Sequence, residues 1–184
     1  MGSYNVKRIA GIGILSAVTV VLAFISNYIP GLAVNLNLAL IPIVVGACIY
    51  GPKAGLFLGV IDGVLICFAP DTLAYFMTHN VIATIILCLL KTGLGGFMSG
   101  VFYRLFKNKN DLLAAFMASL ILPIVNTGVF ILGVVLFFMP VYGTFINLIK
   151  LVLTFNFLIE FLVNLVLSPT VHRIIKAKRI FKQN

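Results

Sequence analysis

The chain has 184 residues, of which 62% are hydrophobic and 9% charged, and its mean hydropathy is +1.20. Because so little polar surface cannot cover a soluble globule, the composition excludes a water-soluble domain and predicts an integral membrane protein. The net charge is +9, but the basic residues lie between apolar runs and not on one solvated face, which argues against nucleic acid as a partner.

Six apolar segments are predicted to cross the lipid bilayer as helices of one compact bundle, an all-α transmembrane domain over residues 1–184. The polar breaks between the segments alternate: every second break holds Lys or Arg, and those opposite hold none. Since Lys and Arg favour the cytoplasmic side, both termini are predicted to be cytoplasmic. The expected segments are 9–26, 38–50, 54–68, 79–106, 112–139 and 144–168, followed by a basic cytoplasmic tail at 169–184.

The first segment, 9–26, lacks a small-residue cleavage site and is predicted to be a retained helix, not a signal peptide. Its small residues Ala10, Gly13 and Ala17 share one helical face, where another backbone could approach closely. A neighbouring helix of the same chain is the simpler partner for this face. The loop that follows, 27–37, carries no charge and is a candidate lid.

Segments 38–50 and 54–68 are predicted to form a hairpin that breaks at Gly51-Pro52-Lys53. Both are shorter than the roughly 20 residues that a straight membrane span needs, so they require tilt or flanking residues. Pro42 falls in the first turn, where its missing N–H costs little. Asp62 lies within the second run, and a carboxylate at that depth costs roughly 3 kcal/mol unless it is paired, hydrated or protonated.

The stretch from Thr72 to Phe106 is longer than one straight span. It predicts either one long kinked helix or a helical loop followed by a helix near 87–106. Tyr75 and Asn80 lie where the chain leaves an outer loop, so their polar groups could face a cavity, and Lys91 falls in mid-segment.

The fifth segment, 112–139, has Asp111 as its expected N-cap. Pro123 is expected to interrupt this segment, and a kink there would point Asn126 and Thr127 toward the bundle interior. The sixth segment, 144–168, is the most polar of the six. Asn147, Lys150 and Thr154 share one of its faces, and Asn156, Glu160 and Asn164 share another.

Catalytic chemistry is not indicated by the sequence. The four acidic residues and two histidines lack the spacing of a hydrolase, transferase or metal site, and 51–55 lacks the spacing of a phosphate-binding loop. Cys48, Cys67 and Cys88 fit neither a zinc site nor a disulfide framework and are expected to be buried thiols. We therefore expect no enzyme, no bound metal and no cofactor on this chain.

A polar-lined cavity in the outer half of the bundle is the remaining feature, with Lys91 and Lys150 as cations available to it. Either lysine could pair with Asp62 or Glu160, or await the carboxylate of a small ligand.

Several short motifs, in their order along the chain, resemble the substrate-binding S component of energy-coupling factor (ECF) vitamin transporters, in particular the branch associated with pantothenate. They are Ile41-Pro42, Gly46, Gly51-Pro52-Lys53-Ala54-Gly55, Phe57 to Gly59, Pro123 to Gly128 and Asn156 to Glu160. The resemblance covers nearly the whole chain and includes the small-residue face of the first segment.

This resemblance implies a multi-pass protein of a prokaryotic plasma membrane that captures a vitamin outside and topples within a complex. The complex holds a transmembrane coupling subunit and two cytoplasmic ATPases, which use the ATP. Ala10, Gly13 and Ala17 would contact the coupling subunit, although Gly13-xxx-Ala17 departs from the family's Ala-xxx-Ala. The implied substrate-binding residues are Asn35, Asn37, Tyr75, Asn80, Lys91, Asn126, Thr127, Asn147 and Lys150.

Other functions remain open at this point. Riboflavin, folate, pyridoxine or hydroxymethylpyrimidine could replace pantothenate as the substrate. A stand-alone secondary transporter could use Asp62 or Glu160 as its proton carrier. A scaffolding membrane protein would bind no small molecule.

Overall fold

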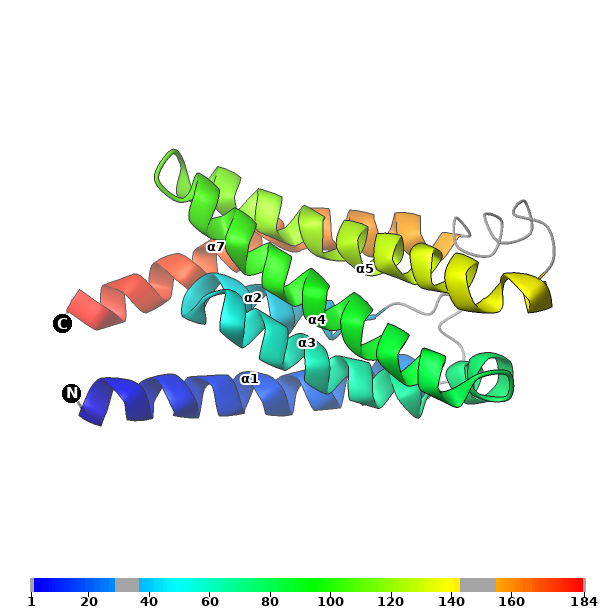
Figure 1. Cartoon of the computed structure of the whole chain (residues 1–184). Helices are drawn as coiled ribbons and strands as arrows, with labels where there is room; N and C mark the ends of the chain where they lie inside the picture. The colour runs from blue at the N-terminus through cyan, green and yellow to red at the C-terminus, as the bar shows by residue number, and fades with distance from the viewer. Residues whose placement is uncertain (1, 29–36, 143–154, 184) are drawn as a thin grey trace.

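The computed structural model describes residues 2–28, 37–142 and 155–183, and every regular element within these ranges is a helix. The helices pack side by side into an elongated bundle, and both described ends of the chain lie at the same end of it (Figure 1). The elements are α1 (Gly2–Tyr28), α2 (Leu40–Tyr50), α3 (Pro52–Cys67), the short π-helix η1 (Thr72–Met77), α4 (Val81–Phe106), α5 (Asp111–Tyr142) and α7 (Phe155–Gln183).

Four of these helices are long and apolar enough to cross a membrane. They are Val6–Asn27, Val81–Phe106, Asp111–Met139 and Phe157–Lys176, with Leu40–Tyr50 as a shorter apolar helix. The predicted shortness of the second and third segments is confirmed, since α2 has 11 residues and α3 has 16. At 1.5 Å per residue α2 is about 16 Å long, about half of a bilayer core. The count of six spans and their orientation remain predictions, because 143–154 lies outside the described residues.

The predicted break of the hairpin is confirmed at Gly51, which both ends α2 and precedes α3. Its φ of +97° is a conformation that side-chain-bearing residues rarely adopt. Gly51 N donates to Ala47 O at 3.0 Å, and Pro52 then begins α3 with its φ already helical. The chain therefore reverses direction with a single residue between the two helices.

Glycines form the contact between α3 and α4. Gly55, Gly59 and Gly63 repeat every four residues, so they share one face of α3. A Cβ at Gly55 or Gly59 would collide with the carbonyl of Gly96 or Thr92, and one at Gly63 would lie 2.7 Å from Cys88 O. The two backbones thus touch directly, as small residues permit between membrane helices.

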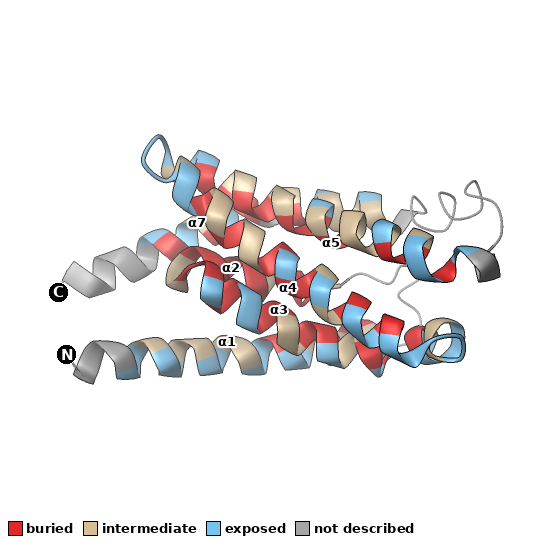
Figure 2. Cartoon of the chain, in the orientation of Figure 1, coloured by how far each residue is buried: buried red, intermediate tan, exposed pale blue. Residues whose placement is uncertain are grey.

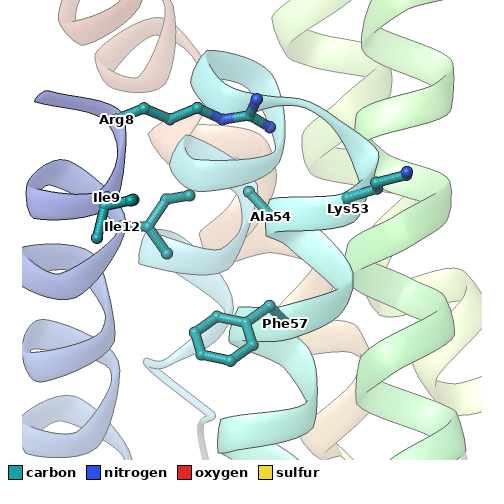
Figure 3. A pocket seen from close by; sticks show the side chains of 6 residues that line it. All are labelled: Arg8, Ile9, Ile12, Lys53, Ala54 and Phe57. Carbon is teal, nitrogen blue, oxygen red and sulfur yellow. The ribbon is translucent and has the colours of Figure 1, made fainter. Parts of the chain in front are cut away.

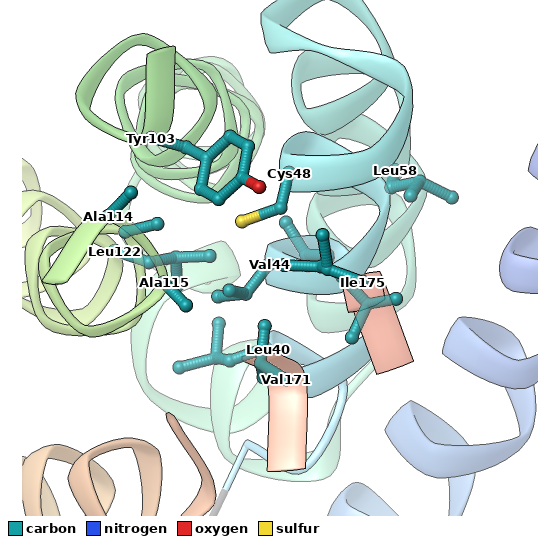
Figure 4. Close-up of a cluster of buried hydrophobic side chains, with 13 residues drawn as sticks. Leu40, Val44, Cys48, Leu58, Tyr103, Ala114, Ala115, Leu122, Val171 and Ile175 are labelled. Atoms are coloured by element: carbon teal, nitrogen blue, oxygen red, sulfur yellow. The ribbon is translucent and has the colours of Figure 1, made fainter. Parts of the chain in front are cut away.

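Two apolar clusters fill the bundle. The larger lies between α2, α4, α5 and α7 at the end where the chain termini lie, and Figure 4 shows Leu40, Val44, Leu122 and Val171 converging there. The smaller one joins α4 and α5 at the other end, where the Phe76 ring packs edge-on against Phe138 with centroids 5.4 Å apart. Buried residues face between helices and exposed apolar ones face outward along most of the bundle, as expected for a lipid-facing surface (Figure 2).

The starts of two helices, α4 and α5, differ from the sequence-based expectations. Between Thr72 and Phe106 the second alternative is found, a helical loop and then a helix, although α4 begins at Val81 and not near 87. Asp111 is the first helical residue of α5, and the cap is Asn110, whose Oδ1 accepts from Leu112 N at 2.8 Å. The predicted Asp111 cap is therefore wrong.

Neither of the later prolines ends a helix. α5 remains helical through Pro123, so the predicted interruption is wrong, and Pro123 is buried. α7 likewise continues through Pro169 to Gln183, so the basic tail extends the last helix. A proline removes one backbone donor but leaves the rest of a long helix intact when packing supports it.

Candidate functional site

Measured from its Gly51 end, α2 is long enough to cross only about half of a membrane. Its other end, where the helix starts, therefore lies inside the bundle. Irregular backbone at such depth is tolerated only where the protein satisfies it. Leu38 N donates to Ser26 Oγ at 3.0 Å, and Ala39 N donates to the side-chain Oδ1 of Asn37 at 3.1 Å. Polar side chains therefore complete the first turn of a half-length helix.

Asn37 joins two carboxylates at this point. Its Nδ2 donates to Asp62 Oδ2 at 2.8 Å, and its backbone N donates to Glu160 Oε1 at 3.2 Å. Residues Asn37, Asp62 and Glu160, here named the Asn37 cluster, thus connect the start of α2 with α3 and α7. The N-terminus of a helix carries a partial positive charge, so it stabilises carboxylates placed against it.

Asp62 is completely buried, with 0% of its surface exposed. Its Oδ2 accepts from Asn37, whereas its Oδ1 has no hydrogen-bond partner among the described residues. A buried acceptor left without a donor costs about 1 to 3 kcal/mol. The cluster therefore contains one buried acceptor that no described residue satisfies.

Lys91 reaches the same region from α4. Its ammonium lies 4.9 Å from the centroid of the Phe130 ring on α5, a cation–π contact. Among the described residues Lys91 forms no ion pair with Asp62 or Glu160. Both alternatives for Lys91, pairing within the protein and binding the carboxylate of a ligand, therefore remain predictions.

Asn126 is the second buried residue with an open acceptor. It is 7% exposed on α5, and its Oδ1 has no partner among the described residues. Gly95 lets α4 approach here, since a Cβ at that position would lie 3.2 Å from Leu122 O. Thr127 is half-buried beside it. The predicted inward orientation of Asn126 is thus found without a break at Pro123.

Tyr75 and Asn80 are not brought to this interior region. Both are exposed near the start of α4, where the Oδ1 of Asn80 caps the helix by accepting from Ala83 N at 3.0 Å. Asn35, Asn147 and Lys150 lie outside the described residues. Of the predicted substrate-binding residues that the structure describes, Asn126 is buried, and Asn37, Lys91 and Thr127 are half-buried.

The small-residue face of α1 is exposed. Ala10, Gly13 and Ala17 are all exposed, and a Cβ added at Gly13 would meet nothing within 4 Å. The neighbouring Gly11 faces inward, against the Tyr50 side chain. The simpler alternative, packing of the small-residue face against another helix of this chain, is therefore not observed among the described residues.

Ser26 and the roles of the two carboxylates were not predicted for this site. Ser26 stands at the end of an apolar run, as many serines of membrane helices do. The residues around it therefore do not indicate that its side chain contacts Leu38. Asp62 and Glu160 carried a signal, because carboxylates within apolar segments are expensive and need partners. Their shared partner, Asn37, lies 25 and 123 residues away along the chain.

No group of three His, Cys, Asp or Glu side chains within the described ranges could hold a metal ion. Cys48, Cys67 and Cys88 are buried free thiols.

A bundle of apolar helices with a half-length helix ending at buried polar groups is typical of multi-pass membrane transport proteins. The family model described as "ECF transporter, substrate-specific component" matches residues 7–172, and the chain belongs to this family. Searches of curated proteins and of solved structures found no match.

Family membership defines the general role of the chain. The family is one of substrate-binding transporter components and not of enzymes. It implies a small-molecule substrate together with a partner transmembrane and ATPase module. The chain is a multi-pass membrane protein.

Proposed function

We propose that this chain is the high-affinity capture subunit of an ECF-type ABC importer in a prokaryotic plasma membrane, and that its substrate is pantothenate. It binds the vitamin in an outward-facing pocket and delivers it by toppling with a coupling subunit and two ATPases, which use the ATP. Family membership carries this proposal. Support comes from the buried, incompletely satisfied polar groups around Asn37 and Asn126.

Pantothenate has the complementary chemistry. Its hydroxyl and amide N–H groups are donors that the open acceptors Asp62 Oδ1 and Asn126 Oδ1 require. The carboxylate of pantothenate requires a cation, for which we propose Lys150 or Lys91. We propose that the amide of Asn147 binds other polar groups of the vitamin.

Calorimetric titration of the purified chain with a panel of B vitamins tests the substrate. A selective response to pantothenate, accompanied by a raised Tm, is expected because a ligand stabilises the folded state it binds. A selective response to riboflavin, folate, pyridoxine or hydroxymethylpyrimidine would replace the substrate and keep the capture function. Silence across the panel from a folded chain would contradict both.

Two lysine substitutions test the assignment of the carboxylate. Lys150→Ala is expected to weaken pantothenate binding by about tenfold or more, the effect of a lost charge-assisted hydrogen bond of about 1.5 to 3 kcal/mol. Lys91→Ala is the second test. The matched control is Lys107→Ala, an exposed lysine beyond the end of α4. Unchanged affinity in both test variants would refute the assignment.

A proton-coupled secondary transporter is the second candidate, because Asn37 joins the buried carboxylate of Asp62 to the half-buried carboxylate of Glu160. That function predicts uptake that survives a block of ATP hydrolysis and stops when the proton gradient is dissipated. The importer predicts the reverse, together with co-purification of the coupling subunit and ATPases.

A further inference from the structure

A cleft of about 370 Å³ opens between the beginnings of α1 and α3, at the end of the bundle where the chain termini lie (Figure 3). It is separate from the Asn37 cluster, because Asp62 lies nine residues further along α3 than Lys53, about 14 Å at the helical rise. The residues that line the cleft are Arg8, Ile9, Ile12, Lys53, Ala54 and Phe57.

The cleft combines positive charge with apolar surface. Its lining contains two basic residues and no acidic one. Arg8 is half-buried and held in place, since its Nη2 donates to Tyr50 O at 3.1 Å. The Arg104 guanidinium packs against nearby Gly51 and adds a third positive group at this hairpin.

The apolar part of the lining continues away from the charges. Ile9 and Phe57 are 70% and 53% exposed, which is costly in water and favourable against hydrocarbon. Figure 3 shows Arg8 and Lys53 toward one end of the cleft and Phe57 toward the other. The ligand that fits this order is a negative group attached to a hydrocarbon chain.

We propose that this cleft binds an anionic phospholipid, with the headgroup phosphate near Arg8 and Lys53 and an acyl chain along Ile9, Ile12 and Phe57. The apolar span of α1 begins at Val6, so Arg8 lies at the membrane boundary, where lipid phosphates are found. Basic pockets between membrane helices on the cytoplasmic side are a recognised way to hold acidic headgroups.

The lipid site and the small-residue face of α1 occupy different sides of the helix. At 100° per residue, the mean direction of Arg8, Ile9 and Ile12 lies about a third of a turn from that of Ala10, Gly13 and Ala17. The two surfaces adjoin at Ile9 and Gly13, which are one helical turn apart.

Native mass spectrometry of the full chain in detergent tests the proposal with phosphatidylglycerol and phosphatidylcholine of identical acyl chains. The wild-type chain is expected to retain phosphatidylglycerol preferentially. The variant Arg8→Gln/Lys53→Gln is expected to lose this preference, by about fivefold for each charge removed. The control Lys107→Gln/Lys109→Gln removes the same charge at the α4–α5 turn, outside the cleft, and is expected to retain it.

Three results would overturn the lipid site. They are equal retention of the two lipids by the wild-type chain, equal losses in the cleft and control variants, and displacement of the lipid by inorganic phosphate at equal concentration. If the double variant does not fold because the Arg8 bond to Tyr50 is lost, Lys53→Gln alone decides the question, since Lys53 is exposed. Vitamin binding is not part of this measurement, so the two proposals fail independently.

Discussion

Replacing Asn37 by alanine tests whether the side chain of this residue holds the start of α2 to α3. Asn37→Ala removes the hydrogen bond to Asp62 and the one accepted from Ala39 N, and it leaves the backbone bond to Glu160 in place. A hydrogen bond to a charged group is worth about 1.5 to 3 kcal/mol and a neutral one about 1 kcal/mol. The expected loss in the free energy of unfolding is about 3 kcal/mol, since Asp62 also loses its partner.

Denaturant titration of the purified chain in detergent, followed by circular dichroism, measures this loss. The matched control is Asn80→Ala, which removes one exposed cap and is expected to cost about 1 kcal/mol. A double-mutant cycle with Asp62→Asn isolates the pair, with a coupling of at least 1 kcal/mol expected for residues in contact. A loss in Asn37→Ala no larger than that in Asn80→Ala, with no coupling to Asp62, would refute the reasoning.

Two further predictions concern glycines in opposite surroundings. Gly59→Ala is expected to lower the free energy of unfolding by about 1 to 3 kcal/mol, because the new Cβ would collide with the Thr92 carbonyl. The control is Gly128→Ala, which should not destabilise the chain because a Cβ at that position meets nothing within 4 Å. Destabilisation of both to the same extent would show that α3 and α4 are not in backbone contact. Gly13→Leu is expected to change the stability of the isolated chain by no more than about 0.5 kcal/mol, because its surroundings are open, and to abolish co-purification with the coupling subunit. Normal co-purification would remove Gly13 from that interface.

Local signals in the sequence located most helices and the hairpin. A glycine followed by a proline is a strong turn signal, so the reversal could be predicted within Gly51-Pro52-Lys53, and the structure narrows it to Gly51. Helix ends were less predictable where two neighbours could serve as caps. Asn110 and Asp111 are both good N-caps, and only the geometry of the turn decided that Asn110 accepts from Leu112 N.

The connections within the site could not be predicted. The apolar segments of a membrane protein have weak periodicity, since lipid and core accept the same side chains, so sequence cannot orient one helix against another. Asn126 was expected to face the interior because of a kink at Pro123, and it is buried although α5 stays helical there. The contacts of Asn37 with Asp62 and Glu160 depend on three helices meeting and have no local signature.

The glycine contact between α3 and α4 has a mechanical consequence. Most helix pairs slide or tilt by small changes in the rotamers of the side chains between them. Where the carbonyls of Gly96 and Thr92 rest directly on Gly55 and Gly59, no side chain lies between the backbones to change rotamer. We therefore expect α3 and α4 to keep their relative position at Gly55 and Gly59, and any motion that admits or releases a ligand to involve the helices joined to this pair through side chains.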